Sequence, residues 1–215
     1  NSQERKGLLR MIIVKHSEKK DAPKLRKTTK KVLRLVDKFE YILTFEGTLD
    51  DYYKIEEEKA DYLKGGIIVL QSPASLEHER IFRDLLTQLH NYVTENNSGE
   101  VLGSRFTIAF GRDFRFEPDI VFISKGNKGI LAEYEFSGTP DLIIEIISKT
   151  SRSYDLQTKR DIYKQYKVKE IYFVDYLERE VFIDVLEGGK YSSLTVKFGG
   201  SVRSKLLRGL DIVIK

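Results

Sequence analysis

The sequence predicts a mixed α/β fold built on a central β-sheet. Two apolar runs, residues 119–123 and 142–147, have the length and composition of strands that are buried on both faces. A helix-like run at 154–166 and an apolar strand at 170–174 follow them. A strand, a helix and a strand with short connections form a βαβ unit with parallel strands. We therefore expect one mixed sheet flanked by helices.

The elements before this centre are marked by a cap and a glycine turn. Residues 32–45 are richer in apolar residues, with a period that is ambiguous between that of a strand and that of a helix. Thr48, followed by acidic residues, predicts the N-cap of a short helix that ends near residue 58. The Gly65-Gly66 pair predicts a hairpin turn that leads into a strand at 67–70.

A longer helix and further strands complete the expected elements. Ser75 predicts the start of a helix that runs to about residue 91. Its apolar stripe consists of Ile81, Leu85, Leu89 and Tyr92. Residues 100–110 are predicted to form one strand. The C-terminal part is β-rich, with short strands expected at 181–186, 191–196 and 206–213.

The length and composition fit one cytoplasmic domain with an extension. The chain has 215 residues, of which 40% are apolar, enough for a packed core. It has no run of 18 apolar residues and no signal-peptide pattern. It also lacks cysteine, which excludes disulfides, thiolate catalysis and cysteine-bound zinc.

Positive charge is concentrated at the N-terminus. Residues 1–40 contain thirteen Lys or Arg and five Asp or Glu, a net charge of +8, while the whole chain carries +4. We therefore expect a basic N-terminal extension over residues 1–47, with a short edge strand at 11–14, and a folded domain over 48–215. A basic arm favours a polyanionic partner such as nucleic acid. The alternative is a solvated tail with no partner.

Two acidic residues stand where strands should be buried. Asp119 begins one apolar strand, and Glu145 lies inside another. Burying an ionised carboxylate costs several kcal/mol unless cations or hydrogen-bond donors face it. Two carboxylates on a rigid sheet are suitable ligands for Mg²⁺. Lys159, on the next helix, could place positive charge near a phosphodiester that is being hydrolysed.

Each of these residues also has a purely structural interpretation. Asp119 after a proline is a common turn residue at the start of a strand. Glu145 could form an ion pair with a lysine, and Lys159 could form an exposed i,i+4 pair with Asp155. Asp141 follows a proline too, but four residues along one strand place it about 13 Å from Glu145, too far to share an ion.

Other polar residues near this pattern favour structural roles. A histidine in the first turn of a helix, as at His78, is more often structural than a catalytic base. Tyr163 and Tyr166 are expected in the core or in the lining of a groove.

Three segments carry a resemblance to a known nuclease family. They are Gly66 through His78-Glu79-Arg80-Ile81, Pro118-Asp119-Ile120-Val121, and Pro140-Asp141-Leu142-Ile143-Ile144-Glu145-Ile146-Ile147-Ser148 through Tyr154-Asp155-Leu156, Lys159 and Tyr163. Together they resemble the PD-(D/E)xK nuclease superfamily, and more closely the Uma-two-type bacterial restriction endonucleases. The resemblance spans about residues 48–215.

This resemblance implies a restriction-endonuclease-like fold and a Mg²⁺- or Mn²⁺-dependent endonuclease that hydrolyses DNA, plausibly as a homodimer. It implies that Asp119, Glu145 and the backbone carbonyl of Ile146 bind the metal. The usual lysine two residues after the glutamate is replaced by Ile147, and the resemblance selects Lys159 instead. Glu79 stands where many such nucleases carry an accessory acid.

Two other functions fit the same residues. One is a catalytically silent protein of the same fold that binds nucleic acid or acts as a scaffold. The other is a metal-dependent hydrolase that acts on RNA or on a small phosphoester. The geometry around Asp119, Glu145 and Lys159 is the feature that separates an active site from a silent one.

Overall fold

The structure of the protein is a computed structural model that describes residues 41–56 and 58–214. Residues 1–40, with the strand expected at 11–14, lie outside the described part. The described residues form the expected mixed α/β fold, but their strands belong to three sheets rather than one. No helix in this part is long and apolar enough to span a membrane.

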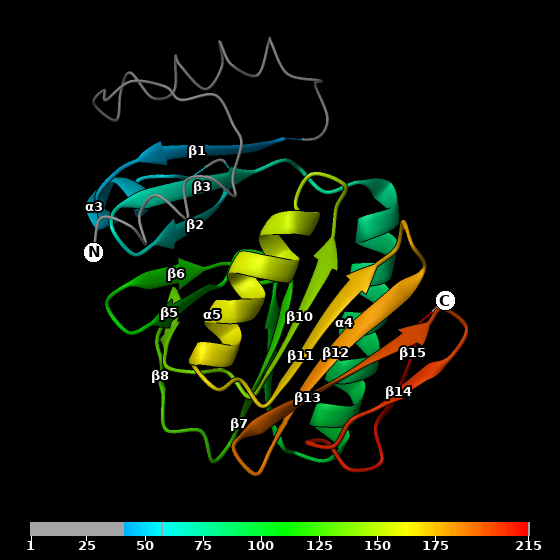
Figure 1. The fold of residues 1–215 in the computed structure, drawn as a ribbon. Coiled ribbons are helices and arrows are strands. Elements are labelled where there is room, and N and C mark those ends of the chain that lie inside the picture. Colours follow the sequence, from blue (N-terminus) through cyan, green and yellow to red (C-terminus); the bar gives the residue numbers. More distant parts are fainter. Residues whose placement is uncertain (1–40, 57, 215) are drawn as a thin grey trace.

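A six-stranded mixed sheet forms the centre of the fold (Figure 1). Its strands, from one edge to the other, are β13 (Lys190–Lys197), β12 (Glu180–Glu187), β11 (Glu170–Asp175), β10 (Leu142–Ile147), β7 (Ile120–Ser124) and β4 (Gly99–Gly103). Strand β10 is parallel to β11 and antiparallel to β7. The parallel pairing of β10 and β11 across a helical segment confirms the predicted strand, helix and strand unit.

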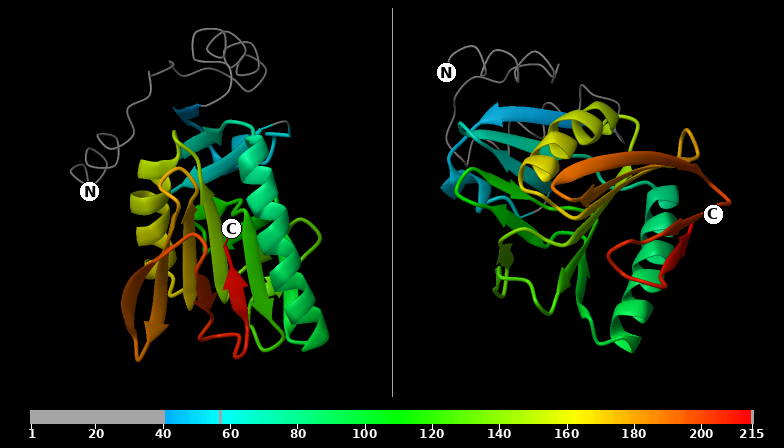
Figure 2. Two further views of the ribbon diagram at one scale, coloured as in Figure 1. Left: turned by 90° about the vertical axis from the view of Figure 1, so that its right-hand side faces the viewer. Right: turned by 60° about the horizontal axis from the view of Figure 1, so that its bottom comes forward.

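Helices lie on both sides of this sheet, as Figure 2 shows in its left view. Helix α4 (Leu76–Glu95) begins at the expected N-cap Ser75, whose Oγ accepts a hydrogen bond from the His78 N–H, and runs beyond its predicted end. On the opposite side, a π-helical turn, η1 (Tyr154–Lys159), continues into α5 (Arg160–Gln165). The helix expected at 154–166 is therefore present, with a wider first half. Such π-helical turns occur often at functional sites.

The side chains of β10 alternate between these two sides. Those facing α4 belong to one core cluster and are Leu142, Ile144 and Ile146. Those facing α5 belong to a second cluster and are Ile143 and Ile147. Because successive residues of a strand point to opposite faces, Glu145 shares the α5 face, which places its carboxylate next to the helix that carries Lys159.

The second sheet has seven strands, most of which precede β7 in the chain. Its strands are β1 (Ile42–Glu46), β3 (Ile67–Gln71), β2 (Lys59–Leu63), β6 (Phe114–Phe116), β5 (Thr107–Phe110), β9 (Glu135–Ser137) and β8 (Ile130–Leu131). Gly65 and Gly66, both with positive φ, join β2 to β3 in the expected hairpin. Thr48 caps helix α3 (Leu49–Tyr52) as predicted, but this helix ends well before residue 58.

The prediction of one strand over residues 100–110 is wrong, and this error hid the second sheet. The chain leaves β4 after Gly103, turns at Ser104 with φ of 69°, and enters β5 in the other sheet. Gly103 lies tightly against β7, since an added β-carbon would come within 2.6 Å of the Asp119 carbonyl oxygen. The turn between the two strands falls at the Gly103-Ser104 pair.

The strand expected at 206–213 is also wrong over its first half. Only β15 (Asp211–Val213) forms there, and it pairs with β14 (Ser201–Arg203). The backbone N–H groups of Lys205 and Leu206 instead donate to the buried carboxylate of Glu170, at 2.5 and 2.8 Å. Because these donors are bound by a side chain, they are not free to join a sheet.

Candidate active site

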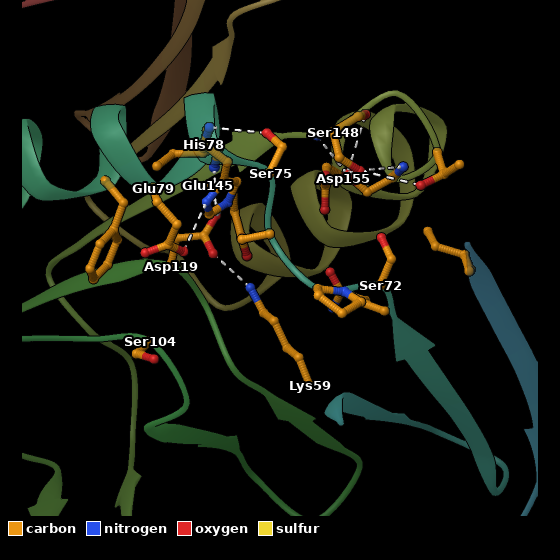
Figure 3. Close-up of a pocket in the computed structure, with 18 of the residues that line it drawn as sticks. Lys59, Ser72, Ser75, His78, Glu79, Ser104, Asp119, Glu145, Ser148 and Asp155 are labelled. Atoms are coloured by element: carbon orange, nitrogen blue, oxygen red, sulfur yellow. Dashed lines mark hydrogen bonds and ion pairs between the residues drawn. The ribbon is translucent and has the colours of Figure 1, made fainter. Parts of the chain in front are cut away.

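A cleft of about 530 Å³ opens where the two sheets meet the start of helix α4 (Figure 3). Its charged lining residues come from β2, α4, β7, β10 and η1 or from positions beside them, and include Lys59, His78, Glu79, Asp119, Glu145 and Asp155. Three of the four predicted catalytic residues, Asp119, Glu145 and Glu79, therefore line one cleft. The fourth, Lys159, lies behind this wall and is fully buried.

Asp119 and Glu145 are brought together by the pairing of their strands. Ile120 of β7 is paired with Ile144 of β10 in the antiparallel register. One residue further along this register, Asp119 stands opposite Glu145, and directly opposite residues have β-carbons about 5 Å apart. The backbone N–H of Ile146 donates to Asp119 Oδ2 at 2.7 Å. Both carboxylates therefore sit on a rigid support at one end of the cleft.

Asp119 is held ionised by two basic side chains. Lys59 Nζ lies 2.7 Å from Oδ1, and His78 Nε2 lies 3.3 Å from Oδ2. Burial alone would raise the pKa of Asp119, but the charge of Lys59, followed by the hydrogen bond and charge of His78, lowers it well below the usual range. His78 is thus a partner of Asp119, with its Nδ1 atom 3.7 Å from Glu79 Oε1.

Glu145 is bound from behind by Lys159 and Tyr163. Lys159 Nζ lies 3.0 Å from Glu145 Oε1, and the Tyr163 hydroxyl donates to the same oxygen at 2.6 Å. Burial raises the pKa of Glu145 to about 7, although Lys159 opposes the shift. Within the described part of the chain, no hydrogen bond or ion pair reaches Glu145 Oε2, so this oxygen is available on the cleft wall.

Lys159 faces three carboxylates at once. Besides Glu145, its ammonium lies 3.3 Å from Asp155 Oδ1 and 3.6 Å from Asp61 Oδ2. Burial opposes the charge of Lys159, but the three carboxylates, Asp61 first, raise its pKa well above the usual value. The i,i+4 pair with Asp155 does exist, yet it is buried rather than exposed, so the structural interpretation based on a solvated pair is wrong.

Lys59 and Asp61 are the site residues that the sequence analysis did not find. Asp61 is fully buried and accepts hydrogen bonds from Tyr154 Oη, at 2.9 Å, and from the backbone of Glu117, at 3.1 Å. Both residues lie on β2, where they share one face with buried Leu63 at a spacing of two. No strand was predicted over these residues, and the two charged side chains masked the alternation.

Asp141 has the structural role that its spacing indicated. Its Oδ1 atom lies 2.6 Å from Lys169 Nζ, while Oδ2 accepts hydrogen bonds from Asn127 and from the backbone of Ser124. It does not line the cleft. Tyr163, also expected in the core or a groove, is fully buried.

Glu79 stands at the rim, with more than half of its side chain exposed. We expect Glu79→Gln to lower metal-dependent cleavage by no more than about tenfold and to change stability by less than about 0.5 kcal/mol, because a solvated carboxylate contributes little. Single-turnover cleavage and urea denaturation of this variant would measure both effects. A loss as large as that of an Asp119 variant would instead make Glu79 a direct ligand.

These residues fit a hydrated Mg²⁺ or Mn²⁺ ion. In the described residues, no group of three or more His, Asp or Glu side chains is arranged to hold a metal. Mg²⁺ is instead commonly held by one or two carboxylates and several waters. Asp119 and Glu145, with the unpaired Oε2 atom of Glu145 at the cleft, provide such a donor set.

Comparison with known proteins identifies the family. The family model Uma2, described as "Putative restriction endonuclease", matches residues 49–214 of the chain. The chain belongs to the Uma2 family. This match covers both acidic strands and the helical segment with Lys159, so the resemblance stated from the sequence is confirmed.

A solved structure supports the fold of this Uma2 chain. The crystal structure of a "putative nuclease belonging to DUF820" from Anabaena variabilis ATCC 29413 matches it with a TM-score of 0.61 and 19% identity, covering 74% of this chain and 90% of that chain. At this identity, the likeness shows a shared fold, in agreement with the predicted restriction-endonuclease-like architecture. No curated protein matches the chain.

Proposed function

We propose that this Uma2 chain is a Mg²⁺- or Mn²⁺-dependent endonuclease that hydrolyses DNA phosphodiester bonds. The observation that carries the proposal is the pair Asp119 and Glu145, which stand opposite each other on neighbouring strands in one cleft, with buried Lys159 against Glu145. The descriptions of the family and of the similar structure both name nucleases. In a catalytically silent protein of the same fold, we would expect Lys159 to point to solvent, or Asp119 and Glu145 to lie too far apart to share an ion.

In this proposal each residue has a defined role. A bound divalent cation would supply Lewis acidity toward water and phosphate. Asp119, Glu145 and the carbonyl of Ile146 would hold it. Lys159 stabilises negative charge by acting through Glu145, since its ammonium is fully buried and contacts that carboxylate directly. Tyr163 donates to the same oxygen, Oε1, so that among the described residues no hydrogen bond involves Oε2.

In this proposal the partner is DNA, and the assembly is the one that the resemblance implies. The net charge of +8 over residues 1–40 favours a polyanion, and DNA is the substrate class that the family description implies. We keep the expectations of a homodimer and of a cytoplasmic location as parts of the same proposal.

Asp119→Asn is expected to abolish detectable metal binding and plasmid nicking while retaining the fold. The amide has nearly the same shape as the carboxylate but lacks the charge that a hard divalent cation requires. Isothermal titration of Mn²⁺ and a nicking assay on the same samples would measure both effects. Asp141→Asn is the matched control, because Asp141 also follows a proline and is also buried, but lies outside the cleft. Nicking that survives in Asp119→Asn would remove this mechanism.

The alternative is a silent protein of the same fold that binds nucleic acid. One observation favours it, since Lys59 and His78 contact both carboxylate oxygens of Asp119. The same samples separate the alternatives. Metal binding without cleavage of DNA, RNA or a small phosphodiester would favour the silent protein. Preferential cleavage of RNA or of the small diester would correct only the substrate class.

A further inference from the structure

Among the residues that the structure describes, Lys59 is the lysine that lines the cleft. It extends from β2, in the seven-stranded sheet, to Asp119, which lies at the start of β7 in the six-stranded sheet (Figure 3). Its side chain is 20% exposed, and it lines the cleft, whereas Lys159 is fully buried behind Glu145. Of these two lysines, Lys59 is therefore the one that a phosphate in the cleft could contact; Arg105 also lines the cleft.

The contact between Lys59 and Asp119 conflicts with metal binding. Lys59 Nζ lies 2.7 Å from Asp119 Oδ1, the distance of a charge-assisted hydrogen bond. A divalent cation on the same carboxylate would lie close to the ammonium, and two positive charges at that distance repel each other. Either the cation or Lys59 must therefore move away from this oxygen.

The side chain of Lys59 is suited to such a movement. Its ammonium is a point charge on a flexible stem of four carbons, so it can turn without disturbing the backbone. The backbone beside it is held, because Arg105 donates to the carbonyl oxygens of Glu56 and Glu58 at 2.7 and 2.9 Å. The strand is thus fixed, while the side chain lines the cleft and is 20% exposed.

We propose that Lys59 is a further catalytic residue, which neutralises Asp119 in the metal-free protein and contacts the scissile phosphate in the loaded one. This inference rests on the function proposed above. With a cation held at Asp119, Lys59 would leave this carboxylate, and its ammonium would donate to a non-bridging phosphate oxygen. Hydrolysis forms a bond from phosphorus to a water oxygen and breaks the bond to the leaving oxygen, which takes up the proton that the water releases. Lys59 keeps its protons throughout and stabilises the added negative charge.

The proposal predicts opposite effects of one substitution on two measurements. In Lys59→Met, Mn²⁺ should bind about tenfold more tightly, because a competing charge near the carboxylate is gone. Single-turnover cleavage at saturating Mn²⁺ should fall by about 100-fold or more, because a donor to the transition state is lost. Isothermal titration in the absence of DNA gives the first value independently of activity. If Lys59 formed only a structural ion pair, its substitution would not both tighten Mn²⁺ binding and slow cleavage.

Lys64→Met is the matched control, since Lys64 follows the same strand and pairs with an aspartate, Asp113, at 3.4 Å, but is mostly exposed. It should change neither measurement. Lys59→Gln, which retains a donor for Asp119, serves if the methionine variant does not fold, and should also show tighter Mn²⁺ binding and slower cleavage.

Unchanged or weaker Mn²⁺ binding, or normal cleavage, in the folded Lys59 variant would overturn this inference alone. Absence of metal-dependent cleavage in the wild type would overturn the proposed function as well.

Discussion

Lys159→Met should lower the free energy of unfolding by about 3–5 kcal/mol, the cost of leaving buried charges without their partner. Lys159 has no exposed surface and lies within 3.6 Å of Glu145, Asp155 and Asp61. Methionine can fill the space of the stem, but it leaves three carboxylates to repel one another in the core. Urea denaturation at pH 8, monitored by circular dichroism, would measure the loss.

The loss should be smaller at pH 5 than at pH 8. Burial raises the pKa of Glu145 to about 7 and also raises that of Asp155. A carboxyl group whose pKa is higher in the folded state than in the unfolded state favours folding when it is protonated, and this contribution disappears as the pH rises through the folded-state pKa. Protonation of Glu145 and Asp155 at low pH therefore removes part of the negative charge that Lys159 otherwise neutralises.

Lys164→Met is the control for this experiment. Lys164 lies on α5 and contacts Asp184 at 3.0 Å, but it is partly exposed, and Arg160 also binds Asp184. Its removal should cost no more than about 1 kcal/mol. A loss of that size in Lys159→Met would show that the carboxylates around it are neutral or solvated, and would contradict the charge cluster described above.

Glu145→Gln should reduce metal-dependent nicking by about 100- to 1000-fold while the protein remains folded. The amide removes a charged metal ligand on the cleft, and loss of one properly placed electrostatic group typically costs a factor of about 100–1000 in rate. Lys159 retains Asp155 and Asp61 as partners, so the cluster survives. Single-turnover nicking, Mn²⁺ titration and thermal unfolding of the same samples would separate chemistry from stability.

Glu117→Gln is the matched control for this variant. Glu117 is a second buried glutamate near the site, and its pKa is also raised to about 7, by burial and by Asp61. It does not line the cleft; it contacts Arg105 at 3.4 Å instead. Its substitution should leave Mn²⁺ binding nearly unchanged. Equal losses in both variants would mean that any buried glutamate disturbs the site and would weaken the case for Glu145.

The sequence predicted those parts of the site that stand on strongly apolar strands. Strands β7 and β10 are continuous apolar runs, so Asp119 and Glu145 were conspicuous within them. Their register was not needed to expect proximity, because the two strands are neighbours in the sheet. The N-cap of α4, Ser75, was also predicted correctly, since its side-chain acceptor determines where that helix begins.

Residues on mixed strands could not be found in this way. Strand β2 reads Lys-Ala-Asp-Tyr-Leu, and its two charged residues hide an inward-facing alternation. The burial of Lys159 was equally invisible, because a lysine four residues after an aspartate has the same spacing on a solvated helix as in a core. The pair of Lys159 and Asp155 is part of a buried cluster because the seven-stranded sheet, which carries Asp61, packs against it.

Gly103 links the shape of the backbone to the chemistry of the cleft. It lies beside Ile120 in the sheet, and the following N–H, from Ser104, donates to the Asp119 carbonyl oxygen at 3.0 Å. A β-carbon here would also come within 3.1 Å of the Phe82 ring. A single added methyl group would thus push the main chain of Asp119 away from its neighbour. Inactivating changes in this protein need not alter any charged residue, and a screen for them should recover position 103 together with the acids themselves.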